Sequence, residues 1–372
     1  MSLRRNIDYL IVLIVVGLVL FGVVMVFSAS YYSYQIREGD GLSRFIKQLQ
    51  GAAIGLALMI VLAFVDYHVL QRALIPIGLL LVSIAFLVAV LFTEEDILGA
   101  KRWLDLGFVS FQPSEVARFA LLVFCADWLS RFRKEVTGRD ISKFMRGMGA
   151  PFLAAVVVCG FILAGSSLSM TIATALMFFC LLVTVGVSGR LLALAGTGVG
   201  VLGAVFTLIA PYRVARLTIF TNPWKDPRAS GFQLIQSLYA LGAGGLFGVG
   251  LGNSRQKYLF LTYCESDFIL SIIGEEFGFV GVAVLLIVFL ALIWRGTLTA
   301  MYAPDTFGLL MAAGITALIA IQVIINVAVV TSSMPPTGVP LPFISAGNTS
   351  LIIFMSEIGV LLNISSQRKR QA

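Results

Sequence analysis

The sequence is poor in charge and in histidine. Only 12% of its 372 residues are charged, whereas 59% are hydrophobic, which is far from the composition of a soluble globular protein. The only histidine, His68, lies in a short turn after the second apolar run, and we interpret it as structural. A Ser-His-Asp triad or a histidine-bound zinc site in the other polar segments is therefore excluded.

Cysteine and nucleotide-binding signals are also scarce. Three of the four cysteines, Cys125, Cys159 and Cys180, lie inside apolar runs, and Cys264 is alone in a polar loop. This pattern excludes a disulfide framework and metal-ligand spacing. The chain shows no nucleotide-binding motif, and its polar gaps are too short for a further soluble domain. We therefore expect no nucleotide cofactor and no nucleic-acid partner.

Long apolar runs dominate what is present. Because about 20 apolar residues span a bilayer, we predict an all-α integral membrane protein of about ten transmembrane helices, with residues 1–372 forming a single polytopic domain. The first run is longer than the core of a signal peptide, so we expect it to be retained. The predicted spans are 8–29, 49–65, 73–93, 113–130, 149–165, 169–187, 191–210, 267–294, 306–330 and 345–365.

Arginine and lysine predict the orientation of the spans. Basic residues before the first span, in the segment 131–146 and in the tail 368–370 all fall on one side. The positive-inside rule makes that side cytoplasmic. An even number of spans then places both termini in the cytoplasm, with a large extracytoplasmic loop at about 211–266, between the seventh and eighth spans.

One polar cluster precedes and opens the fourth span. Pro113 suits the first turn of this helix, and Glu115 and Arg118, three residues apart, share one of its faces. One interpretation is an internal salt bridge. The other is that Lys101, Arg102 and Arg118 bind an anionic substrate, while Glu115 positions one of them or helps to hold a metal.

The long outer loop carries basic residues that the positive-inside rule disfavours there. They include Arg213, Arg216 and Lys257, which either bind a phosphate-bearing lipid or attract anionic headgroups. The segment 232–241 has the pattern of a short helix at the membrane surface. The glycine-rich run 242–252 either lets the backbone approach a neighbour closely or forms a flexible hinge.

Asp267 opens the eighth span. It is a candidate general base, or alternatively a helix cap. At 100° per residue, Glu275 lies within about 80° of Asp267 around the helix axis, whereas Glu276 points the other way. Glu275 is therefore expected to line the same cavity.

Proline shapes the segment before the last span. Four prolines lie within the eight residues 335–342, so this segment cannot be a regular helix. Non-helical backbone at membrane depth requires surrounding protein or a water-filled cavity, so we expect this loop to line the site. The segment 347–350 then offers backbone donors to an anion. Simple helix termination is the alternative.

Taken in order, these segments resemble the signatures of the SEDS (shape, elongation, division and sporulation) peptidoglycan glycosyltransferases over nearly the whole chain. The segment 252–258 resembles the FtsW-type branch and its sporulation relatives more than RodA. The matching segments are 99–103 with 111–115, 222–237, 244–252, 267–269 with 274–276, and 337–345.

The resemblance implies an inverting enzyme that polymerises lipid II on the outer face of the bacterial cytoplasmic membrane, during division or sporulation. It implies a class B penicillin-binding protein and other divisome-type membrane proteins as partners. Asp267 is carried over as the catalytic residue, with Mg or Mn as a candidate cofactor and no assigned metal ligands. The predicted substrate-binding residues are Lys101, Arg102, Trp103, Gln112, Glu115, Arg118, Arg213, Arg216, Gln233, Lys257, Glu275, Pro340 and Ser345.

The chain departs from the family pattern at several positions. Thr262 and Tyr263 replace a usual Pro-Glu pair, Arg118 replaces a usual lysine, and the turn 165–169 is rich in serine. Two alternatives to the enzyme stay open, and the departures near Asp267 bear on the second of them. One is a flippase for lipid II, although no inverted repeat is visible, and the other is an inactive scaffold for a class B penicillin-binding protein.

Overall fold

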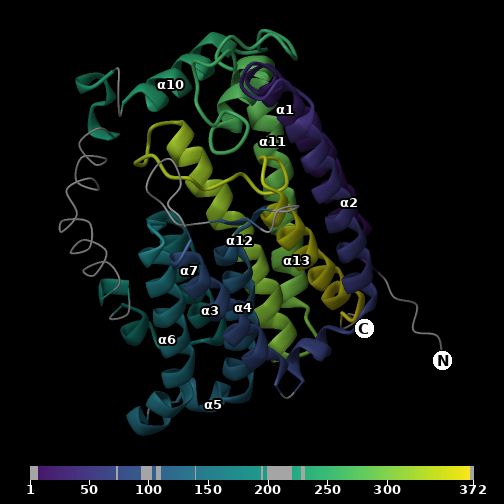
Figure 1. The fold of residues 1–372 in the computed structure, drawn as a ribbon. Coiled ribbons are helices and arrows are strands. Elements are labelled where there is room, and N and C mark those ends of the chain that lie inside the picture. The colour runs from purple at the N-terminus through teal and green to yellow at the C-terminus, as the bar shows by residue number, and fades with distance from the viewer. Residues whose placement is uncertain are drawn as a thin grey trace.

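Long apolar helices make up most of the chain in the computed structural model (Figure 1). The structure describes residues 7–72, 74–93, 103–105, 110–138, 140–193, 196–198, 220–227 and 231–368. The helices are α1 (Tyr9–Arg37), α2 (Ser43–Phe64), α3 (Ile75–Leu91), α4 (Pro113–Arg131), α5 (Arg133–Val136), α6 (Ile141–Ala164), α7 (Leu168–Val185), α10 (Phe232–Gly244), α11 (Ile269–Met301), α12 (Thr306–Val330) and α13 (Asn348–Ser366).

Short elements connect some of these helices. The 3-10 helices η1 (Tyr67–Gln71) and η2 (Pro223–Lys225) follow α2 and precede α10. Strands β1 (Leu104–Asp105) and β2 (Ser110–Phe111) form an antiparallel pair directly before α4, a feature that the sequence did not predict.

The predicted multi-pass, all-helical architecture is confirmed. Seven of the described helices, α1, α2, α6, α7, α11, α12 and α13, are long and apolar enough to cross a membrane. The predicted spans at α3 and α4 are also helical, but α3 is shorter and α4 carries more charge. Most of the predicted span 191–210 lies outside the described residues, so the total of about ten stays a prediction.

Helices α12 and α13 lie in the middle of the bundle (Figure 1). The apolar window of α13 is 83% buried and that of α12 is 67% buried, against 22% for α11. Helices α1, α2 and α11 lie on one side of this pair, and α3, α4, α6 and α7 lie on the other (Figure 1). The polar residues of α12 and α13 are therefore held inside protein.

Helix α11 is broken at Gly278, whose φ of 67° and ψ of −168° are not helical. The segment 245–250, which we call the glycine strap, lies against this break. A Cβ on Gly248 would lie 2.2 Å from the carbonyl oxygen of Glu276, so only glycine fits there. Four backbone hydrogen bonds join the strap to α11: Val249 N to Glu275 O (3.0 Å), Gly250 N to Glu276 O (3.0 Å), Phe279 N to Gly245 O (2.9 Å) and Val280 N to Leu246 O (3.0 Å).

The strap therefore supplies hydrogen-bond partners that α11 loses at its break. This pairing favours the interpretation of the run 242–252 as a close backbone approach over that of a flexible hinge. The surface helix expected at 232–241 is present as α10, which lies at one end of the bundle (Figure 1).

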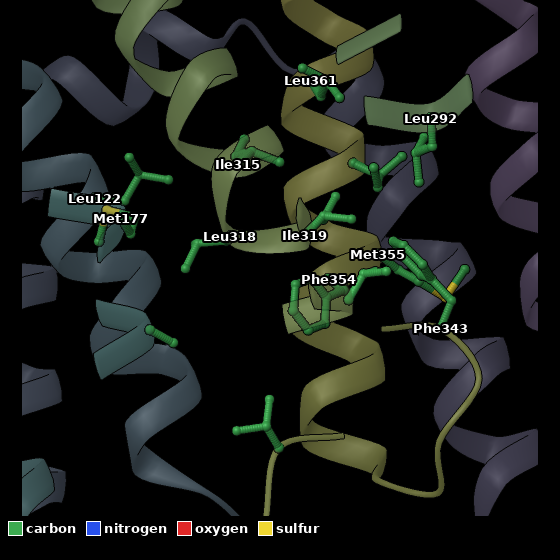
Figure 2. Packing of buried hydrophobic residues seen from close by; sticks show 14 of the residues in the cluster. Leu122, Met177, Leu292, Ile315, Leu318, Ile319, Phe343, Phe354, Met355 and Leu361 are labelled. Carbon is green, nitrogen blue, oxygen red and sulfur yellow. The ribbon is translucent and has the colours of Figure 1, made fainter. Parts of the chain in front are cut away.

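The segment 331–347, here called the proline loop, is non-helical, as its prolines predict. Phe343 anchors it in the core: its ring centroid lies 5.7 Å from that of Phe354 on α13, and both side chains point into the apolar cluster shown in Figure 2. The proline loop is thus fixed by packing at one point. Its polar contacts define the site below.

Candidate functional site

Asp267 lies in a tight turn, 262–268, and not in the helix that follows. Helix α11 begins at Ile269, and its N-cap residue, Phe268, makes no side-chain capping hydrogen bond. The interpretation of Asp267 as a helix cap is therefore wrong. The helical angle that placed Glu275 beside Asp267 also does not apply, because Asp267 precedes the helix.

This turn, which we call the aspartate turn, is held against the proline loop by side chains of that loop and of α12. The Asn326 amide nitrogen, Nδ2, donates to the carbonyl oxygen of Asp267 at 3.0 Å and to that of Val339 at 2.9 Å. The Ser345 hydroxyl donates to the carbonyl oxygen of Ser266 at 2.6 Å. The predicted site residues Asp267 and Ser345 are thus brought together through the backbone of the turn.

Glu115 and Arg118 form a buried ion pair on α4, with 0% and 2% of their side chains exposed. Arg118 also meets Gln322 of α12. In the amide orientation that satisfies both ends of Gln322, its oxygen accepts from Arg118 Nη1 at 2.5 Å and Nη2 at 2.7 Å, and its nitrogen donates to the Pro340 carbonyl oxygen at 3.2 Å. The salt bridge predicted from spacing is confirmed, and Gln322 connects it to Pro340.

Several buried polar atoms in this region have no hydrogen-bond partner within the described part of the chain. They are Glu115 Oε1, Arg118 Nε, Asn326 Oδ1 and, on α13, Glu357 Oε2. Glu357 is close enough to Arg118 and Glu115 to interact with both electrostatically. Because each unmade hydrogen bond costs about 1–3 kcal/mol, this group has binding capacity left for a ligand or water. We call Glu115, Arg118, Gln322, Asn326 and Glu357 the core cluster.

Lys257 and Glu275, by contrast, belong to a cluster at the glycine strap. The Lys257 ammonium donates to Glu276 at 3.0 Å, to Ser28 at 3.1 Å and to the Gly252 carbonyl oxygen at 2.6 Å. Glu275 accepts from the Ser254 hydroxyl and from the backbone N–H groups of residues 255 and 256. These groups are engaged in fixing the loop, and their substrate-binding roles stay predictions.

The other predicted site residues have separate surroundings. Gln233 on α10 donates to the Thr262 hydroxyl at the start of the aspartate turn. Gln112 is buried, and its backbone N–H donates to the Thr349 hydroxyl at 3.3 Å. Trp103 is 37% exposed. The predicted cations Lys101, Arg102, Arg213 and Arg216 lie outside the described residues.

Four polar residues in apolar helices were missed from the sequence: Gln48, Gln322, Asn326 and Glu357. Gln48 of α2 donates to Ser345 O and accepts from Gly347 N, both at 3.3 Å. The available signal was polarity itself, because polar groups inside apolar spans are costly and usually functional. Gln322 and Asn326 are also four residues apart, so they share one helix face.

The described residues contain no group of three or more His, Cys, Asp or Glu side chains that could hold a metal ion. Carboxylate oxygens suit Mg²⁺, but Mg²⁺ commonly takes further ligands from substrate phosphates and water. Asp267 and Glu115 offer such oxygens without a complete ligand set. Mg or Mn therefore stays a prediction that depends on the substrate.

Comparison with known proteins decides the family. The model of the FtsW, RodA and SpoVE family, described as "Cell cycle protein", matches residues 8–370. The chain belongs to this family. Stage V sporulation protein E of Bacillus subtilis (strain 168) is 38% identical over 363 residues, which cover 96% of each chain. The probable peptidoglycan glycosyltransferase FtsW of Geobacter sp. (strain M18) is 37% identical over 371 residues, which cover 98% of each chain.

Solved structures of SEDS proteins share the fold. A chain from a study of polymerisation and crosslinking by a peptidoglycan synthase complex superposes with a TM-score of 0.77, 28% identity and coverage of 98% of this chain and 99% of the other. RodA of Thermus thermophilus gives a TM-score of 0.69 at 24% identity, covering 99% of both chains. The SEDS resemblance seen in the sequence is confirmed, as is a RodA-like, multi-pass membrane fold.

Proposed function

We propose that the chain is a peptidoglycan glycosyltransferase that polymerises lipid II by an inverting reaction, in septum synthesis during division or sporulation. The observation that carries this proposal is the placement of Asp267. Its turn is held to α12 and to the proline loop by hydrogen bonds of 2.6–3.0 Å. The names of relatives that are 37–38% identical over nearly the full length support the reaction.

In this reaction Asp267 acts as the general base. It takes the proton of the 4-hydroxyl of one lipid-linked disaccharide, whose oxygen attacks the anomeric carbon of the lipid-linked chain. The bond from that carbon to the pyrophosphate oxygen breaks, and the lipid pyrophosphate leaves with the electron pair. A positioned base contributes about 10²–10⁴ in rate.

Besides a base, the reaction requires positive charge near the leaving group, which stabilises the departing pyrophosphate. Arg118 is held by Glu115 and Gln322 and keeps its Nε–H unpaired within the described residues. Lys101, Arg102, Arg213 and Arg216 are proposed as further cations, together with a divalent cation. The energy for transfer comes from the lipid pyrophosphate, so no nucleotide is needed.

We further propose that the chain lies in the bacterial cytoplasmic membrane with both termini in the cytoplasm and the aspartate turn on the outer side. The basic residues at the other ends of the helices support this orientation. A class B penicillin-binding protein and other divisome-type membrane proteins are the proposed partners. The similar chain from a peptidoglycan synthase complex supports the first of these.

A flippase for lipid II is the rival function, and one observation favours it. Glu357 lies nine residues after the start of α13, about 14 Å along the helix, and its side chain is buried. Polar groups deep in the bilayer are typical of transport pathways. An inactive scaffold is the third outcome that an experiment must separate.

The test is glycan polymerisation from labelled lipid II by the purified chain, reconstituted in vesicles with its class B partner and a divalent cation. The partner alone, treated with a penicillin, is the control. Polymer that requires the chain establishes the enzyme. Transfer of labelled lipid across the vesicle membrane without polymer establishes the flippase, and neither activity in a folded complex leaves the scaffold.

A further inference from the structure

The proline loop has few backbone hydrogen-bond donors of its own. Prolines at 335, 336, 340 and 342 have no N–H group. The loop's own amides at Ile344 and Ser345 donate to the carbonyl oxygen of Leu341, but the buried carbonyls before it need donors from elsewhere, since unpaired buried carbonyls are costly. Two neighbouring carbonyls, those of Val339 and Pro340, receive these donors from Asn326 and Gln322 of α12.

These two side-chain amides lie one turn apart on a single helix face. Gln322 and Asn326 are 0% and 1% exposed, so neither is a surface group. Each amide also reaches a second group outside the proline loop. Asn326 donates to the backbone of Asp267, and Gln322 accepts from the guanidinium of Arg118.

Asp267, the proposed base, and Arg118, the proposed cation, are therefore both hydrogen-bonded to side chains of the same helix, α12. The two amides contact them from positions four residues apart, about 6 Å along the axis of α12. We propose that Asn326 and Gln322 are positioning residues that fix Asp267 relative to Arg118. This inference rests on the proposed function, because it concerns how the two groups of that site, Asp267 and Arg118, are kept in position.

The Asn326 side chain also carries a free-energy cost, because one of its two polar atoms is buried without a hydrogen-bond partner in the described part of the chain. Its Nδ2 makes two hydrogen bonds, but its Oδ1 is buried and has no partner within the described residues. An apolar residue at 326 would avoid this unpaired acceptor but would leave two backbone carbonyls without a donor. Positioning of the aspartate turn accounts for the polar side chain in an otherwise apolar helix.

The test compares Asn326→Leu and Gln322→Glu with the native chain in lipid II polymerisation. A displacement of a catalytic group by about 1 Å can cost about 10²-fold in rate. We therefore expect Asn326→Leu to lower kcat about 10²-fold while KM for lipid II changes by less than about threefold. Gln322→Glu keeps an acceptor for Arg118, loses the donor to Pro340 and adds a negative charge beside Arg118, so we expect a loss of at least about tenfold.

Thr316→Val on the same helix is the matched control. Thr316 is also buried, but its hydroxyl donates to Ala312 within α12. This variant is expected to keep native kcat and KM.

Hydrogen exchange gives a readout that does not depend on activity. The Ala346 amide donates to Glu265 O at 2.8 Å and reports directly on the contact between the proline loop and the aspartate turn. We expect Asn326→Leu to speed exchange at Ala346 and Phe268 while the amides of α13 exchange as in the native chain.

Unchanged exchange at these amides would overturn the inference, whatever the activity. Faster exchange with native kcat would also overturn it, as would a loss of kcat that the Thr316→Val control shares. If the native chain itself forms no polymer, the proposed function fails, whereas the exchange data still decide whether Asn326 holds the aspartate turn.

Discussion

Two buried clusters of charge lie in this bundle, and they differ in how completely their atoms are paired. At the glycine strap, the Lys257 ammonium has three acceptors, and both carboxylates of Glu275 and Glu276 accept hydrogen bonds at each oxygen. In the core cluster, Arg118 Nε and Glu115 Oε1 are buried without partners within the described part of the chain.

This difference separates a structural role from a functional one. A fully paired buried cluster has no capacity for a ligand, and removing one partner strands the other charge. An incompletely paired cluster carries an energetic cost in the free protein that a substrate can offset. The pairing of the strap cluster therefore favours a role in holding the fold, and that of the core cluster favours the proposed reaction, while the substrate-binding roles of Lys257 and Glu275 stay predictions.

The largest effect expected on stability is at the strap cluster. Lys257→Met removes the partner of the buried Glu276 carboxylate and should destabilise the protein by about 3–5 kcal/mol. Adding Glu276→Leu should recover part of this loss, since no charge is then stranded. Denaturant unfolding in detergent measures both, and a cost below about 1 kcal/mol for the single variant would show that the pair does not hold the strap.

A slightly smaller loss is expected at the break in α11. Gly248→Ala places a Cβ 2.2 Å from the Glu276 carbonyl oxygen and requires a positive φ of 80°. Strain and overlap together should cost about 2–4 kcal/mol. Gly242→Ala is the control, because a Cβ there has nothing within 4 Å. Equal unfolding midpoints for the two variants would contradict the close contact between the glycine strap and α11.

Arg118→Lys tests the core cluster. A lysine keeps the charge but cannot make the forked contacts to Glu115 and Gln322 at once. We expect a stability loss of about 1–2 kcal/mol and a drop in kcat/KM for lipid II of about tenfold. Native kcat/KM in this variant would show that only the charge of Arg118 matters, and not its geometry.

The smallest effect is expected at the other end of the bundle, at Asp66. Burial raises the pKa of Asp66, but hydrogen bonds from the His68 backbone and ring and from Gln367 outweigh it, so the pKa lies below its ordinary 3.8. The resulting stabilisation is complete above pH 3.8 and is lost as pH falls through the lower folded value.

Because Asp66 is largely exposed, Asp66→Asn should cost less than about 1 kcal/mol at pH 7. The difference in unfolding free energy between the native chain and this variant should shrink at pH 3. A difference of the same size at both pH values would show that the carboxylate charge does not contribute.

The helices of this fold could be predicted because their cause is local. Apolar runs of sufficient length appear as α1, α2, α6, α7, α12 and α13 near the expected positions, and the prolines of 335–342 alone exclude a helix there. The break at Gly278 could not be predicted, because its cause is the glycine strap, about 30 residues earlier in the sequence.

The candidate site was only partly predictable for the same reason. The spacing of Glu115 and Arg118 predicts their pairing within one helix face. The pairing of Lys257 with Glu276 depends on how the strap folds back on α11, and the contact of Asn326 with Asp267 spans 59 residues. Asp267 was expected inside the helix because local pattern cannot distinguish a last loop residue from a first helical one.

The most direct test of the account is polymerisation of lipid II by the Asp267→Asn variant, which keeps the shape of the side chain and removes its basicity. Ser266→Ala is the neighbouring control, since within the described residues the Ser266 hydroxyl donates only to Tyr263 O, at 3.4 Å. The account predicts a loss of about 10²–10⁴ in rate for Asp267→Asn, with native unfolding and partner binding, and near-native rates for the control. Native rates in a folded Asp267→Asn variant would contradict the assignment of Asp267 as the general base.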